Sequence, residues 1–246
     1  MTTPRQPGHG TADRSPLRLH HEPRRPRAAV LLLHGGRADS LTAPPAVNLP
    51  LARMRPFAAA LRDGPDGPGL LVASVRYRLR GWNGHRADAL RDALRAVDEL
   101  HRRAPGIPVV LVGHSMGGRA ALGAAAHDAV RGVVALAPWC PPGEPVRPLA
   151  GRSAAFLHDE ADRVTSARQT WDFARRAAAA GARVRTVAMP GGGHTMLRGA
   201  RTWHRVTVSL TTAMLAGRPL TDLDDLPGPP GFPDPLDLAA PAGREG

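Results

Sequence analysis

The chain has 246 residues, of which 42% are hydrophobic and 4% aromatic, and this length and composition suit one large domain with a sheet between helices. Its formal net charge of +12 comes from 33 basic residues, all arginine, which are spread along the sequence. Such dispersion argues against a nucleic-acid-binding protein, whose basic residues gather on one face or helix. The densest arginine clusters, 24–27 and 76–80, remain compatible with an anionic substrate or partner.

The single cysteine and the terminal segments bear on compartment and domain organisation. Cys140 alone excludes an intrachain disulfide, which fits a reducing compartment. Residues 1–16 lack the apolar core of a signal peptide, and no apolar run has the length of a membrane-spanning helix. We therefore expect a cytoplasmic protein without a membrane partner. One folded domain is expected at 17–216, between a flexible leader and an unstructured Pro/Asp-rich tail at 217–246.

Short apolar runs alternate with segments of helical periodicity along the expected domain. Strands are predicted at 28–33, 69–75, 107–112, 132–137, 154–158 and 182–189, and helices at 50–61, 86–103, 119–126, 166–180 and 200–215. Continuous apolar runs are typical of strands buried on both faces, and such strands are joined by crossover helices. The pattern predicts an α/β fold with a doubly wound, mostly parallel sheet flanked by helices.

A serine lies in a glycine-rich turn directly after a predicted strand. Residues 113–118 read Gly-His-Ser-Met-Gly-Gly, and glycines on both sides of Ser115 permit the sharp strand-to-helix turn of a G-x-S-x-G nucleophile. At a helix N-terminus, free backbone N–H groups favour developing negative charge. A chance glycine-serine loop would lack this strand-and-helix context. The pattern therefore predicts that Ser115 is a catalytic nucleophile.

A serine hydroxyl needs a base that accepts its proton, and the chain offers 11 histidines. His194 is the best placed, because glycines 191–193 follow the last predicted strand and give the backbone freedom to bring the imidazole over the serine. His204 lies within a predicted helix and is less suitable. We therefore expect His194 to be the general base, rather than only a polar loop residue.

Four segments together carry a resemblance to a known superfamily. They are Leu-His-Gly-Gly at 33–36, Gly-His-Ser-Met-Gly-Gly at 113–118, and the segments around 156–164 and 191–194. In content and order they resemble the α/β-hydrolase superfamily, and the resemblance covers roughly residues 28–215. It implies an active site at the carboxyl ends of the strands and the triad order serine, acid, histidine. The compact chain is similar to small esterases and dienelactone-hydrolase-like members.

Three acids at 159–162 follow a predicted strand and are candidates for the triad carboxylate. Asp162 is expected to fill this role, because it matches the family's His-Gly-x-x-Asp-x-x-Val segment with His158 in register. Asp159 stands where the family has glycine, which keeps Asp159 open as the alternative. Asp162 is also placed to cap the next predicted helix, and Glu144, after the preceding strand, is a more distant option.

Acyl transfer places negative charge on the former carbonyl oxygen, and two backbone N–H groups usually stabilise it. Met116, directly after the predicted nucleophile, is expected to supply one donor. The second is expected from the loop after the first predicted strand, where the resemblance implies Gly36, with Arg37 next. These assignments give an expected oxyanion hole of Gly36 and Met116.

The family often inserts a lid between the fourth and fifth predicted strands, but here this segment is only 138–153 and includes five prolines. We expect an open site without a substantial lid, suited to small or surface-presented substrates. Arg37, Trp82 and Trp139 are candidate substrate contacts, although the tryptophans are equally compatible with core packing. The sequence has neither zinc-ligand spacing nor a phosphate-binding glycine motif, so no metal or cofactor is expected.

The sequence therefore predicts a serine hydrolase that cleaves a small-molecule carboxylic ester or thioester through an acyl-enzyme. The alternative is a catalytically silent protein of the same fold that engages an acidic partner through its arginine clusters. The presence of all three triad residue types in the required order argues against this alternative. Nucleic-acid binding fits least well, because aromatic residues are few and the arginines are scattered.

Overall fold

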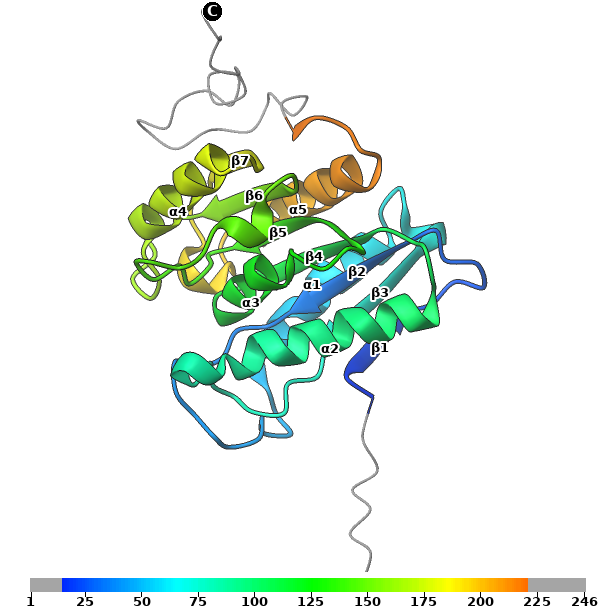
Figure 1. The fold of residues 1–246 in the computed structure, drawn as a ribbon, viewed down its shortest axis with the longest axis horizontal. Coiled ribbons are helices and arrows are strands. Elements are labelled where there is room, and N and C mark those ends of the chain that lie inside the picture. Colours follow the sequence, from blue (N-terminus) through cyan, green and yellow to red (C-terminus); the bar gives the residue numbers. More distant parts are fainter. Residues whose placement is uncertain (1–14, 221–246) are drawn as a thin grey trace, which may run out of the picture.

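The structure, a computed structural model, describes residues 15–220 and is built around one mostly parallel β-sheet (Figure 1). In this part of the chain the sheet has seven strands: β1 (Leu17–His21), β2 (Ala28–Leu33), β3 (Leu70–Val75), β4 (Val109–His114), β5 (Val130–Leu136), β6 (Ser153–His158) and β7 (Arg183–Ala188). They lie in the order β1-β3-β2-β4-β5-β6-β7. β1 pairs antiparallel with β3, and all other pairs are parallel. The predicted doubly wound α/β fold is confirmed.

Helices cover both faces of the sheet. α1 (Leu49–Arg62) and α5 (Ala200–Leu215) pack on one face, and α2 (Asp88–Arg103), α3 (Met116–Ala124) and α4 (Ala167–Ala179) pack on the other. Each face has its own apolar core, with Trp203 fully buried in one and Phe156 fully buried in the other. Burial of one such large apolar side chain contributes about 2 kcal/mol. The two cores together fix the helices against the sheet.

The central strand β2 shows why a continuous apolar run forms here. Val30 and Leu32 face the core beneath α1 and α5, whereas Leu31 and Leu33 face the core beneath α2 and α3. Side chains alternate along a strand, so a strand covered on both faces needs apolar residues at every position. All residues from 29 to 33 are accordingly buried.

The structure differs from the sequence prediction in one missed strand and in the ends of several elements, most of them by one or two residues. β1 is absent from the prediction, because this short edge strand, Leu-Arg-Leu-His-His, has none of the continuous apolar character of the central strands. β4 continues to His114, two residues beyond the predicted end. α3 begins at Met116 rather than at Arg119, because the chain enters the helix directly after Ser115. The glycine-rich motif is therefore shared between the end of a strand and the start of a helix.

The carboxyl ends of the parallel strands lie along one edge of the sheet and carry the candidate site. Gly36 follows β2, Ser115 follows β4, Asp162 follows β6 and His194 follows β7. These positions are up to about 160 residues apart in sequence, but parallel strands bring their carboxyl ends to the same edge. The fold thus gathers the four predicted site segments.

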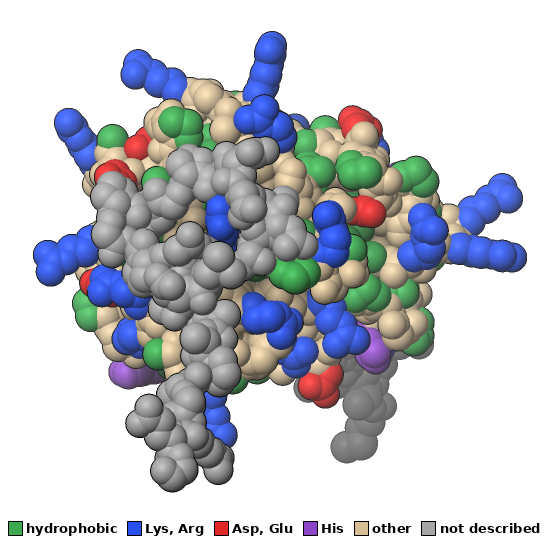
Figure 2. Space-filling view, turned by 90° about the horizontal axis from the view of Figure 1, so that it is seen from above, with side chains coloured by type: hydrophobic (Ala, Val, Ile, Leu, Met, Phe, Trp, Pro, Cys, Tyr) green, Lys and Arg blue, Asp and Glu red, His purple; other side chains and the backbone are tan. Residues whose placement is uncertain are grey.

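The connection between β5 and β6 contains only the short 3₁₀ helix η3 (Arg147–Leu149) and holds no lid. The predicted terminal segments, 1–16 and 217–246, lie for the most part outside the described residues. None of the helices within residues 15–220 combines the length and the apolar character needed to cross a membrane. On the face shown in Figure 2, the arginine side chains stand apart rather than forming one basic patch.

Gly117→Ala is expected to lower the free energy of unfolding by about 3 kcal/mol, because a Cβ there would overlap the carbonyl oxygen of Leu33 in the packed sheet. The matched control is Gly123→Ala in the same helix, where a Cβ would meet only the side chain of Leu90 at 3.0 Å. Its stability should stay within about 1 kcal/mol of the parent. Urea denaturation measures both variants, and equal stabilities of the two would contradict the tight strand-to-helix turn.

Candidate active site

The candidate nucleophile lies in a strained turn between β4 and α3. Ser115 has φ 56° and ψ −121°, a backbone conformation that residues with a side chain rarely adopt. A Cβ at Gly113 would overlap the carbonyl oxygen of Gly117, and a Cβ at Gly117 would overlap that of Leu33. Close backbone approach therefore requires both glycines of the G-x-S-x-G pattern. The strain costs about 1–3 kcal/mol and sets the serine at the edge of the sheet.

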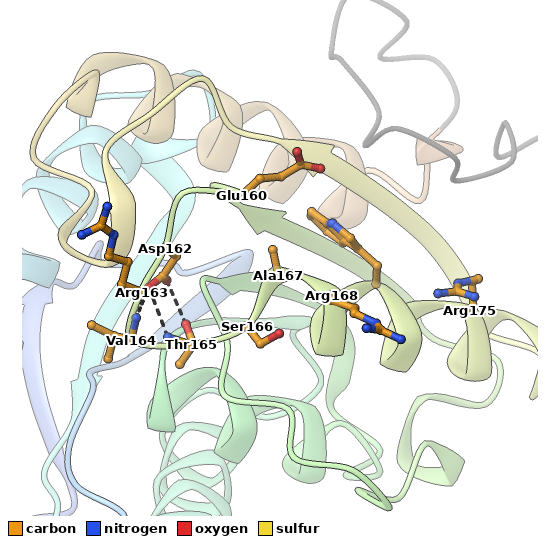
Figure 3. Close-up of a pocket in the computed structure, with 10 residues that line it drawn as sticks. Glu160, Asp162, Arg163, Val164, Thr165, Ser166, Ala167, Arg168 and Arg175 are labelled. Carbon is orange, nitrogen blue, oxygen red and sulfur yellow. Dashed lines mark hydrogen bonds between the residues drawn. The ribbon is translucent and has the colours of Figure 1, made fainter.

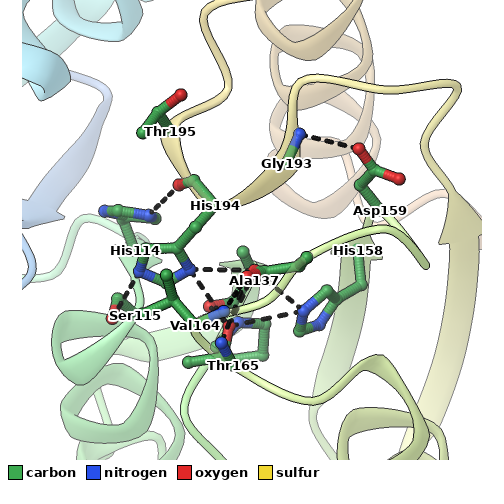
Figure 4. Close-up of polar contacts among 12 residues, drawn as sticks. His114, Ser115, Ala137, His158, Asp159, Val164, Thr165, Gly193, His194 and Thr195 are labelled. Atoms are coloured by element: carbon green, nitrogen blue, oxygen red, sulfur yellow. Dashed lines mark hydrogen bonds and ion pairs between the residues drawn. The ribbon is translucent and has the colours of Figure 1, made fainter.

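Three side chains from three loops form a continuous series of hydrogen bonds (Figure 4). His194 Nε2 lies 3.0 Å from Ser115 Oγ, and His194 Nδ1 lies 2.8 Å from Asp162 Oδ2. When Nδ1–H donates to the carboxylate, the Nε2 lone pair is left to accept the serine proton. The arrangement has the geometry needed for general-base activation of a hydroxyl.

The carboxylate of Asp162 is completely buried and accepts hydrogen bonds from several directions. Besides His194, its partners are His158 Nε2 at 3.2 Å, the N–H groups of Val164 at 2.7 Å and Thr165 at 3.1 Å, and the Thr165 hydroxyl at 2.9 Å. Burial raises the pKa of this carboxyl, but the hydrogen bonds from His158, His194 and Val164 outweigh it. The net pKa is well below its ordinary value, so the group stays ionised.

His158 gives the same carboxylate a second imidazole partner. It is fully buried, and its Nδ1 lies 2.9 Å from Thr170 Oγ1 on α4. The tautomer that satisfies both contacts donates Nε2–H to Asp162 and accepts the Thr170 hydroxyl proton at Nδ1. His158 thereby ties the acid to the end of β6 and to α4.

The other acids that the sequence offers have different partners. Asp159 Oδ2 accepts the Gly193 N–H at 2.7 Å, and Glu144 pairs with Arg119 at 2.6 Å. In the described part of the chain, neither carboxylate is paired with the candidate base. Of these acids, Asp162 is the one that contacts His194. Asp159 instead accepts the backbone N–H of Gly193, the residue before His194.

The candidate base is carried by the 3₁₀ helix η4 (Gly193–Thr195), whose backbone is held at each residue. Its first N–H donates to Asp159, its second carbonyl accepts from His114 Nε2 at 2.9 Å, and its third carbonyl accepts from Arg53 on α1. The glycines at 191–193 have φ values of 93°, 109° and 52°, which a residue with a Cβ adopts only with strain. The loop for which the sequence predicts a flexible backbone is therefore held by three contacts to other parts of the chain.

His114 supports the candidate base from within the motif itself. Burial, and to a lesser degree the proximity of His194, lower the pKa of His114 to about 3. The ring stays neutral at ordinary pH, so its Nε2–H can donate to the His194 carbonyl without placing a positive charge beside the base. Its Nδ1 has no partner among the described residues.

The predicted oxyanion loop packs closely against the start of α3. A Cβ at Gly36 would overlap the Met116 side chain and the carbonyl oxygen of Arg80, so only glycine fits there. The N–H of Arg37 already donates to that Arg80 carbonyl at 2.9 Å, which leaves Gly36 as the candidate donor on this loop. The Met116 N–H lies in the first helical turn, where N–H groups lack acceptors within the helix.

Trp82 and Trp139 pack around one arginine. The Arg119 guanidinium carbon lies 3.9 Å from the centroid of the Trp82 ring and 4.6 Å from that of Trp139, and Arg119 also pairs with Glu144. Trp82 is only 5% exposed and belongs to the apolar core. These contacts account for both tryptophans as packing residues, and their role as substrate-contacting walls stays a prediction.

A hollow of about 630 Å³ lies beside the loop that carries Asp162 (Figure 3). Residues of this loop and of α4 line it: Glu160, Asp162, Arg163, Val164, Thr165, Ser166, Ala167, Arg168, Trp171 and Arg175. Neither Ser115 nor His194 belongs to its lining, so it borders the support of the site rather than the serine. Within residues 15–220, no three His, Cys, Asp or Glu side chains are grouped so that they could hold a metal ion.

A family model matches residues 30–242, which is most of the chain, and this model describes the alpha/beta hydrolase family. The chain belongs to the alpha/beta hydrolase family. The matched part of this family member includes all four strand ends that carry the candidate site. A comparison with curated protein sequences gives no significant match.

Solved structures of low sequence identity share the fold of this family member. Est1E from Butyrivibrio proteoclasticus is 13% identical over 81% of this chain and 93% of its own, with a TM-score of 0.59. An esterase from Pyrobaculum calidifontis is 18% identical over 80% of this chain and 78% of its own, with the same TM-score of 0.59. TT1662 from Thermus thermophilus is 18% identical over 82% and 99%, with a TM-score of 0.58. These similarities concern the fold.

Sequence reasoning missed the residues that hold the three candidate side chains in place. Thr165 contacts the carboxylate and lies 3.1 Å from His194 Nδ1, and Arg53 and His114 fix the backbone of η4. The only signals in the sequence are local: His114 stands inside the motif, and Thr165 follows Asp162 by three residues. The contact of Arg53 has no such signal, because α1 meets η4 only in the folded chain.

The parent protein is expected to lose a stabilising contribution of Asp162 in acid. Its folded-state pKa lies below the ordinary value of 3.8, so the unfolded chain binds the proton more readily. The contribution is fully present above about pH 4 and is lost as pH falls further, through the folded-state pKa. In denaturant unfolding, the free energy of unfolding of Asp162→Asn should be about 3 kcal/mol below that of the parent near neutral pH. This difference between the two proteins should be smaller at about pH 3. A difference independent of pH would contradict the lowered pKa.

Proposed function

We propose that this alpha/beta hydrolase family member is a serine hydrolase that cleaves a carboxylic ester or thioester through an acyl-enzyme. Ser115 is the nucleophile, His194 the general base and Asp162 the carboxylate that orients the base. The observation that carries the proposal is the unbroken series from Ser115 Oγ to His194 at 3.0 Å and from His194 to the buried Asp162 at 2.8 Å. A catalytically silent binding protein would have no need of this series.

The reaction proceeds in two halves. Ser115 Oγ attacks the acyl carbon while His194 Nε2 takes the hydroxyl proton, and Asp162 stabilises the imidazolium that forms. Collapse of the tetrahedral intermediate breaks the bond to the leaving alcohol or thiol, which receives the proton from His194. Water then attacks the acyl-enzyme, and its proton passes to His194. When this second tetrahedral intermediate collapses, the bond to Ser115 Oγ breaks, His194 returns the proton to Oγ, and the acid is released.

Backbone N–H groups of Gly36 and Met116 stabilise the oxyanion of each tetrahedral intermediate. The support for this assignment is the tight packing of Gly36 on Met116 and the pairing of the neighbouring Arg37 N–H with Arg80. Loss of one such donor typically costs about 3 kcal/mol of transition-state stabilisation. The open edge of the sheet, without a lid between β5 and β6, favours small or surface-presented substrates.

Esterases occur among the proteins that share this fold. One is the Pyrobaculum calidifontis esterase, and Est1E from Butyrivibrio proteoclasticus has been solved with ferulic acid bound. Together with the family membership, these proteins support an acyl ester as the first class of substrate to test. A small aryl ester tests the chemistry without assuming the natural acyl group.

The parent protein is expected to gain one covalent adduct from a fluorophosphonate probe, because only a serine activated by a base attacks this phosphorus readily. Ser115→Ala should give no adduct, and His194→Ala should slow labelling by about 10³-fold or more. Ser209→Ala, a serine on α5 away from the candidate site, should label like the parent. Intact-mass spectrometry over time measures all four proteins. A folded parent that stays unlabelled would refute the serine hydrolase.

Asp162→Asn is expected to lower kcat on an aryl acetate by about 10³- to 10⁴-fold, because the amide favours the wrong tautomer of the base. Asp159→Asn should cost only about tenfold, because it weakens one backbone contact before the histidine. Steady-state release of the phenol measures both, and circular dichroism checks that both variants fold. The reverse order of the two losses would make Asp159 the triad acid.

A further inference from the structure

Two hollows meet on one side of the candidate oxyanion loop. The first, of about 320 Å³, is lined by Gly36 and its neighbours, by Arg37 and Arg80, and by the loop at 44–50. The second, of about 620 Å³, lies beyond the same loop. Five residues line both hollows and mark the junction: His34, Pro44, Pro45, Val47 and Asn48. We call the two together the arginine groove.

The sheet order explains where the arginine groove runs. It begins at the carboxyl end of β2, next to the strand that carries Ser115, and reaches the carboxyl end of the neighbouring β3 at Arg76. Arg18 on β1 is paired in register with Ser74 near that end of β3. The groove therefore leads from the candidate oxyanion donor along the strand ends, away from His194 and toward the β1 edge. Like the hollow beside α4, it is not lined by Ser115 or His194, and it meets the candidate site at Gly36.

The described lining of the groove is strongly basic. The first hollow includes Arg37 and Arg80, and the second includes four arginines: Arg18, Arg55, Arg76 and Arg78. Among residues 15–220, no aspartate or glutamate lines either hollow. Three of these arginines belong to the cluster at 76–80, whose charge has no part in the proposed triad chemistry.

Within the described part of the chain, most of these arginines have no acidic partner. Arg78 pairs with Asp92 at 2.6 Å, and Arg76 donates Nε–H to the Leu17 carbonyl. Within residues 15–220, Arg18, Arg55 and Arg80 form no ion pair. Burial, together with the charges of Arg18 and Arg55, lowers the pKa of the neighbouring His20, as expected beside uncompensated guanidinium groups.

On the basis of the proposed function, we propose that the substrate is an ester or thioester whose acyl part ends in an anionic group, a carboxylate or a phosphate, held in the arginine groove. The scissile carbonyl lies at Gly36, and the anionic end extends past His34 to Arg18 and Arg55. Planar guanidinium groups bind both anions in paired hydrogen bonds. The arginines of the described lining attract a negative substrate and repel a cationic one.

The test compares two aryl esters of the same length. The p-nitrophenyl monoester of adipic acid carries a carboxylate, and the p-nitrophenyl ester of its monoamide is the neutral isostere. We expect the parent to favour the anionic ester by at least tenfold in kcat/KM, with the preference declining as salt rises. Arg18→Gln and Arg55→Gln should each lower the anionic-to-neutral ratio about five- to tenfold, because each removes a charged hydrogen bond.

The matched control is Arg168→Gln, which removes an exposed arginine from the hollow beside α4 and should leave the ratio unchanged. Inhibition of neutral-ester hydrolysis by adipate or by inorganic phosphate distinguishes the two anions, and the stronger inhibitor identifies the kind of substrate. A ratio near one in the parent, or a ratio that Arg18→Gln and Arg55→Gln leave unchanged, would overturn the anionic substrate while the serine hydrolase stands.

If the proposed hydrolase function itself is wrong, the measurements give a different result from the one that overturns the substrate alone. A parent that gains no fluorophosphonate adduct and cleaves neither ester is not a serine hydrolase, and the substrate proposal falls with it. Calorimetric titration with adipate then decides on the groove alone: binding that Arg55→Gln abolishes and Arg168→Gln leaves intact keeps the groove as an anion site. If adipate does not bind to the parent protein, the proposal that the groove is an anion site is overturned as well.

Discussion

A fully buried carboxylate must have all its acceptor positions satisfied, and this requirement at Asp162 holds the candidate site together. An ionised group out of water is tolerated only when hydrogen bonds replace its hydration. Here the replacements come from the loop after β6, from β6 itself through His158, and from η4 after β7 through His194. The carboxylate therefore organises the elements that surround it. These donors keep the Asp162 carboxylate ionised. The ionised carboxylate in turn favours the His194 tautomer that is protonated at Nδ1 and leaves Nε2 free to face Ser115.

The part of the candidate site that carries Ser115 is held in place by close backbone packing at the edge of the sheet, rather than by charge. The turn at Ser115 has positive φ, and Gly36, Gly113 and Gly117 pack so tightly that a Cβ at any of them would overlap the backbone or Met116. Backbone strain at the serine is maintained because the cores on both faces of the sheet hold β2 and β4 in register. The same tight packing holds Gly36 against the side chain of Met116, which supports the proposal that these two residues supply the oxyanion donors.

The central part of the fold follows from the sequence because its signals are local. β2 is one continuous apolar run, and Gly113 to Gly118 occupy the predicted strand-to-helix turn. β1 escapes prediction because a short edge strand lacks that apolar signal, and the start of α3 shifts because Ser115 leads straight into the helix. In the site, the distances between Ser115, His194 and Asp162 depend on which strands are neighbours. The contact of Arg53 arises only when distant segments meet, so it has no pattern in the sequence. Of the arginine groove, the cluster at 76–80 is visible in the sequence, whereas the approach of Arg18 and Arg55 to it depends on the fold.

The central claim is that Asp162 fixes His194 in the Nδ1–H tautomer and leaves Nε2 to accept the Ser115 proton. Nitrogen-15 NMR of histidine-labelled protein, with the His194 signals assigned by their loss in His194→Ala, measures this tautomer directly. The account predicts a protonated Nδ1 with a strongly downfield proton and an unprotonated Nε2, a pattern that persists in Ser115→Ala and disappears in Asp162→Asn. A His194 ring protonated at Nε2, or one that exchanges between tautomers in the parent protein, would contradict it.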